Sequence, residues 1–212
     1  MTTHVCIVAN GRLSNDFVGE MRKNDVVIGV DRAAYWLITH GIIPDVAIGD
    51  FDSVTESELA VINQKVKIVK RYKSEKDFTD TELALRYAFG LHPTSIIFFG
   101  GSGSRLDHTM GTLQLLEQSK KRGILAVFCD EHNEVMLQGR GRTILKKREG
   151  YRYVSVVPIT HTIQISLSKL KYNVTNKVIY RGQTIGISNE FVGKEAEITL
   201  LRGKALIIQS RD

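Results

Sequence analysis

Two aspartates separated by one residue are the first feature of the chain that suggests chemistry. Asp50 and Asp52 follow the apolar residues 46–48 and Gly49, and in an extended loop their side chains would point to one side and that of Phe51 to the other. Two carboxylates about 5 Å apart repel each other by roughly 3 kcal/mol at an effective dielectric constant near 20. Because a divalent cation removes this cost, and Mg²⁺ binds carboxylates together with phosphate oxygens, the pair predicts a metal-assisted phosphate site. A surface turn is the alternative, since Gly and Asp are common turn residues.

A second acidic group lies at the expected start of a helix. Asp77 and Asp80 are three residues apart and lead into the amphipathic residues 81–89. One of them is expected to be an N-cap or first-turn acid, where the helix dipole favours negative charge, but this role accounts for only one acid. Helix starts also bind phosphates, so Thr79 and the backbone N–H groups beside it are candidates for a nucleotide contact. Both acidic groups follow expected strands, and we therefore expect them to meet at one edge of a sheet.

A glycine- and serine-rich segment, residues 100–104, follows the apolar residues 96–99 and leads into Arg105, Asp107 and His108. Small residues let the backbone approach a ligand closely, and a guanidinium fork matches phosphate oxygens. The segment is not a Walker A loop, because no Gly-Lys-Ser/Thr follows it. His108 is a candidate general base, phosphate donor or helix-start hydrogen-bonding residue.

Residues 1–132 alternate between short apolar segments and amphipathic segments. Buried parallel strands are expected at residues 4–10, 26–30, 46–48, 66–69, 96–99 and 125–128. Helices are expected at residues 33–40, 56–64, 81–89 and 108–122. This alternation predicts a doubly wound, Rossmann-like α/β domain with a parallel sheet, whose ligands bind at the carboxyl ends of the strands. Asp31, which follows residues 26–30, places one more acid at that edge.

Residues 133–212 lack helical periodicity. Short, partly alternating segments, most of them separated by glycine-containing turns, occur at residues 143–145, 153–157, 162–167, 178–180, 184–187, 196–201 and 205–209. This pattern predicts a small all-β sandwich or barrel domain. A core of about 80 residues is small, so packing against the first domain or a second chain is expected.

Charge is distributed unevenly along the 212 residues, which carry a net charge of +6. Residues 133–212 have 14 Lys and Arg against 6 Asp and Glu, whereas residues 1–132 are slightly acidic. A basic excess is compatible with a polyanion partner or with a solvated surface. Few aromatic residues and no ribonucleoprotein-type stacking motif in the basic region argue against nucleic acid. No apolar run approaches the ~20 residues that span a membrane, and two cysteines do not form a disulfide framework, so we expect a cytoplasmic protein.

Six segments of the chain together carry a family resemblance. They are Gly41-Ile42-Ile43-Pro44-Asp45, Gly49-Asp50-Phe51-Asp52-Ser53, Lys76-Asp77-Phe78-Thr79-Asp80, Arg105-Leu106-Asp107-His108, Leu170-Lys171-Tyr172 and Ile187-Ser188-Asn189-Glu190. In content and order they closely resemble the motifs of the thiamine pyrophosphokinase family, and the resemblance covers roughly residues 25–190. The resemblance implies an enzyme that transfers the pyrophosphoryl group of ATP to the hydroxyl of thiamine and releases AMP.

The same resemblance implies a role for individual residues. Asp50, Asp52, Asp77 and Asp80 would be the catalytic acids around Mg²⁺ and the ATP phosphates. Nucleotide or substrate contacts would come from Asp31, Ser53, Thr79, Arg105, Asp107, His108, Ser188 and Asn189. Because family members are homodimers, Ser188 and Asn189 would reach thiamine across the subunit interface. Residues 1–132 would then be the catalytic domain, and residues 133–212 the thiamine-binding and dimerisation domain.

Two other functions are compatible with the residues alone. A glycosyl- or nucleotidyltransferase would use Asp50-Phe51-Asp52 as a metal-binding pair for a nucleotide sugar. A basic RNA-binding protein would grip phosphates with residues 133–212, and the first domain would serve as a scaffold.

Overall fold

The computed structural model describes residues 2–73, 75 and 77–212, and the chain forms two compact units. The first ends at Glu131 and the second is His132–Asp212. The sequence placed this boundary one residue later, between 132 and 133. Each unit has its own hydrophobic core.

The first unit is built on a parallel sheet of six short strands. They are β1 (His4–Val8), β2 (Val26–Val30), β3 (Val46–Gly49), β4 (Ile68–Arg71), β5 (Ser95–Phe99) and β6 (Leu125–Cys129). Their order across the sheet is β6-β5-β1-β2-β3-β4, and every neighbouring pair is parallel. The central strands are buried on both faces, which explains why the sequence reads there as continuous apolar runs.

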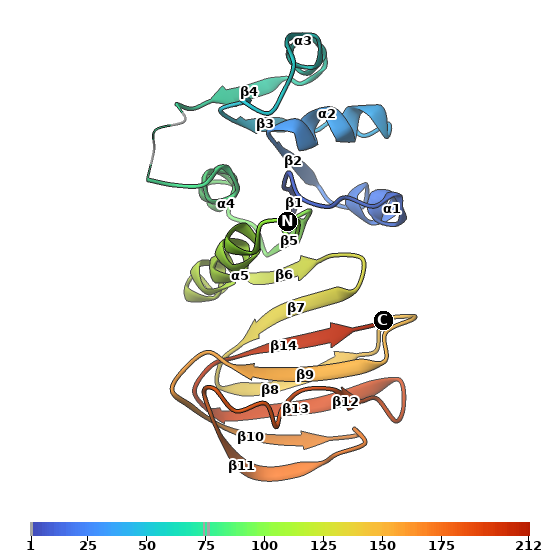
Figure 1. The fold of residues 1–212 in the computed structure, drawn as a ribbon, viewed down its shortest axis with the longest axis vertical. Helices are drawn as coiled ribbons and strands as arrows, with labels where there is room; N and C mark the ends of the chain where they lie inside the picture. The colour runs from blue at the N-terminus through green and yellow to red at the C-terminus, as the bar shows by residue number, and fades with distance from the viewer. Residues whose placement is uncertain (1, 74, 76) are drawn as a thin grey trace. The chain divides into compact units, whose positions relative to one another are not determined.

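Helices cover both faces of this sheet, as the alternating pattern predicts. They are the short helices η1 (Asn15–Phe17) and α1 (Val18–Met21), then α2 (Arg32–Thr39), α3 (Glu56–Lys65), α4 (Asp80–Phe89) and α5 (Leu106–Lys121). The helices α1 and α2 lie on one side of the strands, and α4 and α5 lie on the other (Figure 1). Cys6 and Val8 pack with Phe17, Met21 and Leu37 on the α1–α2 side. The pair η1–α1 was not predicted, because it is too short to show helical periodicity.

The strand order locates the place where a ligand is expected. The chain moves outward from β1 to the edge strand β4 and then returns through α4 to β5, on the other side of β1. Outside the carboxyl ends of β1 and β5 lies the switch point at which doubly wound sheets bind ligands. The loops after these strands run together: the N–H of Ala9 donates to the carbonyl of Phe99 over 2.8 Å, and the N–H of Gly11 to that of Gly100 over 2.8 Å.

The second unit is an antiparallel β sandwich. Its strands are β7 (Asn133–Gln138), β8 (Gly141–Lys146), β9 (Tyr153–Pro158), β10 (Thr162–Ser168), β11 (Val174–Tyr180), β12 (Asn189–Glu190), β13 (Glu195–Arg202) and β14 (Ala205–Ser210). One layer has the order β12-β9-β14-β7 and the other β11-β10-β13-β8. Side chains from both layers, including Val156, Ile207, Ile165 and Ile198, form one core.

One expected strand of this unit, residues 184–187, is wrong. The N–H of Ile187 donates to the carbonyl of Thr184, which closes a turn instead of extending a strand. The carbonyl of Gly186 accepts from the N–H of Val156, and the regular pairing of this segment with β9 begins only at Asn189, in β12. No helix among the described residues combines the length and the apolar character that crossing a membrane requires.

Candidate active site

A cavity of about 440 Å³ lies at the carboxyl ends of the parallel strands. Its walls come from the loops after β1, β2, β3 and β5 and from the first turns of α4 and α5. The loops after β1 and β5 form the switch point, so the cavity lies where the topology places a ligand.

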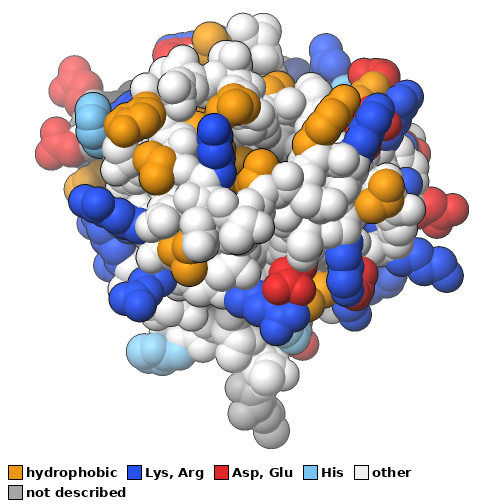
Figure 2. Space-filling view, turned by 90° about the horizontal axis from the view of Figure 1, so that it is seen from below, with side chains coloured by type: hydrophobic (Ala, Val, Ile, Leu, Met, Phe, Trp, Pro, Cys, Tyr) orange, Lys and Arg blue, Asp and Glu red, His pale blue; other side chains and the backbone are white. Residues whose placement is uncertain are grey.

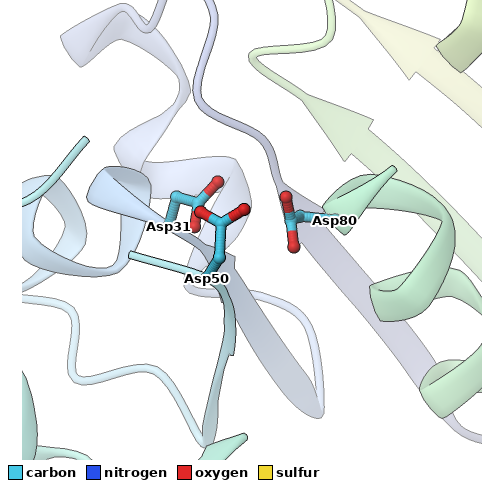
Figure 3. A group of neighbouring side chains, drawn as sticks. All are labelled: Asp31, Asp50 and Asp80. Atoms are coloured by element: carbon cyan, nitrogen blue, oxygen red, sulfur yellow. The ribbon is translucent and has the colours of Figure 1, made fainter. Parts of the chain in front are cut away.

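Three carboxylates meet at this cavity. Asp31 follows β2, Asp50 follows β3 and Asp80 begins α4, and one carboxylate oxygen from each lies within 4.8 Å of the others. Figure 3 shows the three side chains turned toward one another from these separate elements. At an effective dielectric constant near 20, each pair at this separation repels by about 3 kcal/mol. A bound cation would remove this repulsion, and three hard oxygen donors suit Mg²⁺.

Asp31 reaches this cluster through an unusual backbone conformation. Its φ is 48° and its ψ is −128°, a region that non-glycine residues rarely adopt. Its N–H donates to the carbonyl of Ile48 over 2.9 Å, and its Oδ1 accepts from the N–H of Phe51 over 3.1 Å. The carboxylate occupies the space that a side chain at position 49 would fill, since a Cβ on Gly49 would lie 1.9 Å from Oδ1 of Asp31. Gly49 is therefore required for this placement.

The loop that holds Asp50 and Asp52 is not extended, so the extended conformation expected for it is wrong. Phe51 has a φ of 61° and buries its ring with Ala47 and Ile62. The N–H of Asp52 donates to Oδ1 of Asp50 over 3.1 Å, as in an Asx turn. Asp52 consequently lies outside the three-carboxylate cluster and lines a separate hollow that also borders Asp50.

At the start of α4, one polar residue caps the helix and another belongs to the carboxylate cluster. Thr79 is the N-cap, and its hydroxyl accepts from the N–H of Glu82 over 3.2 Å. Asp80 follows in the first turn and joins the cluster, whereas Asp77 is exposed and lies outside it. Thr79 also lines the cavity, where a nucleotide could reach it. Its contact with a nucleotide stays a prediction. Lys76, part of the same motif, lies outside the described residues.

The glycine-rich loop leads into α5 as predicted. Gly100 has a φ of 64°, and a Cβ there would lie 2.2 Å from the carbonyl oxygen of Ala9. Only glycine therefore fits where this loop touches the loop after β1. Ser102, Arg105 and His108 also line the cavity.

Arg105 and Asp107 form a two-bond ion pair at the start of α5. Nη2 of Arg105 lies 2.6 Å from Oδ2 of Asp107, and Nε lies 3.2 Å from Oδ1. The hydrogen bonds from Arg105 lower the pKa of Asp107, and Asp107 raises the pKa of the guanidinium. Asp107 does not line the cavity, but it holds the guanidinium that does. The pair is exposed, so a phosphate can compete for the fork.

The loop after β1 contains cavity residues that the sequence prediction missed. Ala9, Asn10 and Gly11 line the cavity, and Nδ2 of Asn10 donates to the hydroxyl of Ser53 over 3.1 Å. Ser53 was predicted as a site residue, and this bond ties its loop to the one after β1. The available signal was the Asn10-Gly11 pair, a common turn sequence directly after a strand. Extending the expected strand to residue 10 concealed it.

In the second unit, Asn189 has a structural role. Its Oδ1 accepts from the N–H of Tyr172 over 3.0 Å, and its Nδ2 donates to the carbonyl of Tyr172 over 2.7 Å. Asn189 is buried, whereas Ser188 is exposed, with a φ of 59° and its N–H bonded to the hydroxyl of Ser155. The predicted thiamine contact therefore suits Ser188, while the amide of Asn189 is engaged in holding the residue 170–172 segment.

The carboxylate of Glu190 anchors the same segment. It lies 2.9 Å from Nζ of Lys171 and 3.0 Å from Nε of Arg152, and these two cations lower its pKa. The two second-unit motifs found in the sequence, residues 170–172 and 187–190, are thus one connected structure.

Comparison with known proteins shows which family this chain resembles. Residues 18–128 match the model of the thiamin pyrophosphokinase catalytic domain, and residues 142–204 match the model of the thiamin pyrophosphokinase vitamin B1 binding domain. The thiamine pyrophosphokinase of Bacillus subtilis (strain 168) is 36% identical over 209 residues, which cover 97% of this chain and 98% of that protein.

Solved structures agree with the sequence match. The crystal structure of the Bacillus subtilis enzyme superposes with a TM-score of 0.92 at 34% identity, covering 99% of each chain. That of the Geobacillus thermodenitrificans thiamin pyrophosphokinase gives 0.88 at 31% identity, covering 99% of this chain and 98% of that one. The two domain models together match most of the chain, and the relatives are matched over nearly their full length. The chain therefore belongs to the thiamin pyrophosphokinase family.

Proposed function

We propose that this protein transfers the pyrophosphoryl group of ATP to the hydroxyl of thiamine, forming thiamine diphosphate and AMP. The observation that carries the proposal is the cluster of Asp31, Asp50 and Asp80 at the switch-point cavity. The protein also matches both the catalytic-domain model and the vitamin B1 binding-domain model of the thiamin pyrophosphokinase family. That membership leaves the nucleotide-sugar transferase and RNA-binding alternatives without support.

We propose Mg²⁺ as the metal, held by the carboxylates of Asp31, Asp50 and Asp80. All three donors are the hard oxygen ligands that Mg²⁺ selects. When bound, the ion would neutralise the phosphate charge that builds up during transfer. Asp31 was predicted as a substrate contact, and the geometry favours adding it to the metal-binding residues. Asp52 and Asp77 stay predictions as catalytic acids, since they lie outside the cluster.

The reaction requires positioning more than covalent catalysis. The hydroxyl oxygen of thiamine attacks the β-phosphorus of ATP, the bond from that phosphorus to the oxygen bridging to the α-phosphorus breaks, and AMP leaves. His108 lines the cavity and is the base we assign to the hydroxyl proton. Arg105, released from Asp107, supplies a guanidinium fork to the phosphate oxygens. Thiamine carries a fixed positive charge, which suits an acidic cavity.

We further propose a homodimer in which the second unit contributes to substrate binding. This unit exposes large apolar side chains, among them Tyr172, Ile185 and Val192 at 61%, 65% and 70% exposure. Figure 2 shows a face of the molecule on which apolar side chains lie between Lys and Arg, with few acids. Exposed apolar groups of this kind favour association with a second chain. Light scattering coupled to size-exclusion chromatography gives the mass that tests it.

A cytoplasmic location is also part of the proposal. Cys6 and Cys129 are both buried, form no disulfide, and lie in one core. Buried thiols that form no disulfide are typical of proteins in a reducing compartment.

One assay tests the proposed activity. Purified protein is incubated with ATP, Mg²⁺ and thiamine, and AMP, ADP and thiamine diphosphate are quantified by chromatography. We expect AMP and thiamine diphosphate in equal amounts, and almost none from Asp80→Asn. Asp16→Asn, an exposed acid in η1, is the matched control and should retain full activity. ADP as the product, or full activity of Asp80→Asn, would contradict the proposal.

A further inference from the structure

We propose that Arg71 and Lys73 bind the two terminal phosphates of ATP, the group that is transferred, in a hollow beside the carboxylate cluster. This inference rests on the proposed function and adds a diphosphate subsite to it. Neither residue belongs to the six segments that carry the family resemblance.

The end of β4 places these residues beside the metal-binding loop. Arg71, the last residue of β4, pairs with Gly49 at the end of β3. The N–H of Tyr72 donates to the carbonyl of Gly49 over 2.9 Å. The backbone at 71 and 72 is therefore fixed next to the residue that precedes Asp50, and Arg71 and Lys73 extend from this anchored segment.

The hollow has a volume of about 550 Å³ and is lined by Asp50, Asp52, Arg71, Tyr72, Lys73 and Glu75. Asp50 lines both this hollow and the switch-point cavity. The two spaces therefore border one carboxylate of the proposed metal site. A ligand that contacts metal at Asp50 has space on both sides.

The charges of the hollow suit a phosphate chain that is bound together with metal. Among the described residues, no carboxylate lies within ion-pair distance of Arg71 or Lys73. Their cationic groups are thus available to a ligand. A guanidinium offers a fork to phosphate oxygens and an ammonium offers a point charge, and both bonds are stronger than those between neutral groups. The hollow also contains the carboxylates of Asp50, Asp52 and Glu75, so its overall charge does not exclude cationic thiamine, and selectivity for a diphosphate would come from direct bonds to Arg71 and Lys73.

The arrangement also orients ATP. The switch-point cavity has glycine-rich walls, at residues 100–104, that let a nucleoside and its first phosphate approach the backbone. The terminal phosphates would then extend past Asp50 toward Arg71 and Lys73. Because the β- and γ-phosphates are the group transferred, the same two cations would hold the diphosphate of the product.

This orientation predicts a pattern across ligands. Ligands that carry the transferred diphosphate are ATP, inorganic pyrophosphate and thiamine diphosphate, whereas AMP and thiamine lack it. Arg71→Gln and Lys73→Gln should weaken each of the first three by about tenfold or more, the loss expected for a charge-assisted hydrogen bond. They should change the affinities for AMP and thiamine by less than about twofold.

The test is isothermal titration calorimetry of the full chain with Mg²⁺ and each of the five ligands. Lys67→Gln removes an exposed lysine just before β4 that lies outside the hollow, and it should bind all five like wild type. Arg71→Lys should restore part of the lost ATP affinity, because it keeps the charge without the fork. Thermal unfolding of each variant checks the fold.

Two results would overturn the inference. One is unchanged affinity for ATP and pyrophosphate in both glutamine variants. The other is an equal loss for AMP and ATP, which would place the cations at the first phosphate or report a general disturbance of the site. Either result leaves the proposed function standing if wild type forms thiamine diphosphate. A wild-type protein that forms none would contradict the proposed function itself.

Discussion

Replacing Gly49 with alanine tests whether the position of one carboxylate controls this active site. Gly49 ends β3, immediately before Asp50. A Cβ at this position would lie 1.9 Å from Oδ1 and 2.7 Å from Cγ of Asp31, and real Cβ atoms essentially never approach other atoms closer than 3.0 Å. The carboxylate of Asp31 would therefore have to move by about 1 Å from its place in the cluster.

The size of the effect follows from this displacement. Forcing an extra methyl group into a packed site costs about 1–3 kcal/mol of stability. The displaced carboxylate would also lose the 3.1 Å hydrogen bond from the N–H of Phe51, a net cost of about 1 kcal/mol. A 1 Å error in a catalytic group costs about 100-fold in rate. We expect kcat/KM for thiamine to fall by about that factor, and the Mg²⁺ concentration for half-maximal rate to rise.

The assay is AMP formation measured against Mg²⁺ concentration, together with thermal unfolding of each variant. Gly19→Ala is the matched control, because a Cβ at Gly19, in the helix α1, meets nothing within 4 Å. That variant should keep wild-type activity and Mg²⁺ dependence, and gain stability if anything.

A double-mutant cycle decides whether the effect passes through Asp31. In an Asp31→Ala background the atoms that the new methyl group meets first are gone, so Gly49→Ala should cost much less than it does alone. Additive losses from the two substitutions would refute this reasoning. Wild-type turnover and Mg²⁺ dependence in Gly49→Ala would refute it more directly.

Two further predictions concern the scaffold. Hydrogen bonds from Thr55 and then from Arg32 lower the pKa of Glu58 below 4.5, so its charged form stabilises the fold above that pH and the contribution is lost as pH falls through the lowered pKa. Glu58→Gln should therefore lower the free energy of unfolding at pH 7 and have a smaller effect near pH 3, and urea unfolding at both values checks this. Asn189→Ala should lower the free energy of unfolding by about 1–3 kcal/mol, because the N–H and carbonyl of Tyr172 lose their partner. Equal urea midpoints for the variant and wild type would contradict that structural role.

Much of the fold could be predicted from the sequence because burial leaves a direct pattern. Strands β2 and β5 read as continuous apolar runs since helices cover both sheet faces, and the structure confirms them. In the second unit, β10 and β13 alternate buried and half-exposed residues as a sandwich requires. Residues 184–187 were misassigned because two isoleucines flanking Gly186 mimic a strand. The turn at these residues accepts a hydrogen bond from the N–H of Val156, about 30 residues earlier in the chain. The local pattern of apolar residues carries no information about such a distant contact.

The sequence predicted where in the sheet the active site lies, at the carboxyl ends of the strands, but not how its side chains are arranged. Asp50 was found because it follows an apolar strand, and Asp80 because it lies at the start of an amphipathic helix beyond the next expected strand; the carboxyl ends of parallel strands share an edge. Grouping Asp52 with them required an extended loop, which Phe51 does not adopt. Its ring turns into the core instead, and the sequence gives no signal of this left-handed turn. The closeness of Asp31 to Asp50 required the strand order, which places β2 beside β3.

Backbone strain and the carboxylate cluster coincide in this protein, and the coincidence has a physical explanation. Asp31 and Phe51 both have positive φ, a conformation that costs roughly 1–3 kcal/mol for a residue other than glycine. The buried ring of Phe51 and the hydrogen bond from its N–H to Asp31 stabilise these two conformations together. Relaxing either residue would turn a carboxylate away from the cluster and break that bond. The ends of β2 and β3 thus hold the half-buried carboxylates of Asp31 and Asp50 close to each other at the cavity, at a cost in mutual repulsion that the fold sustains.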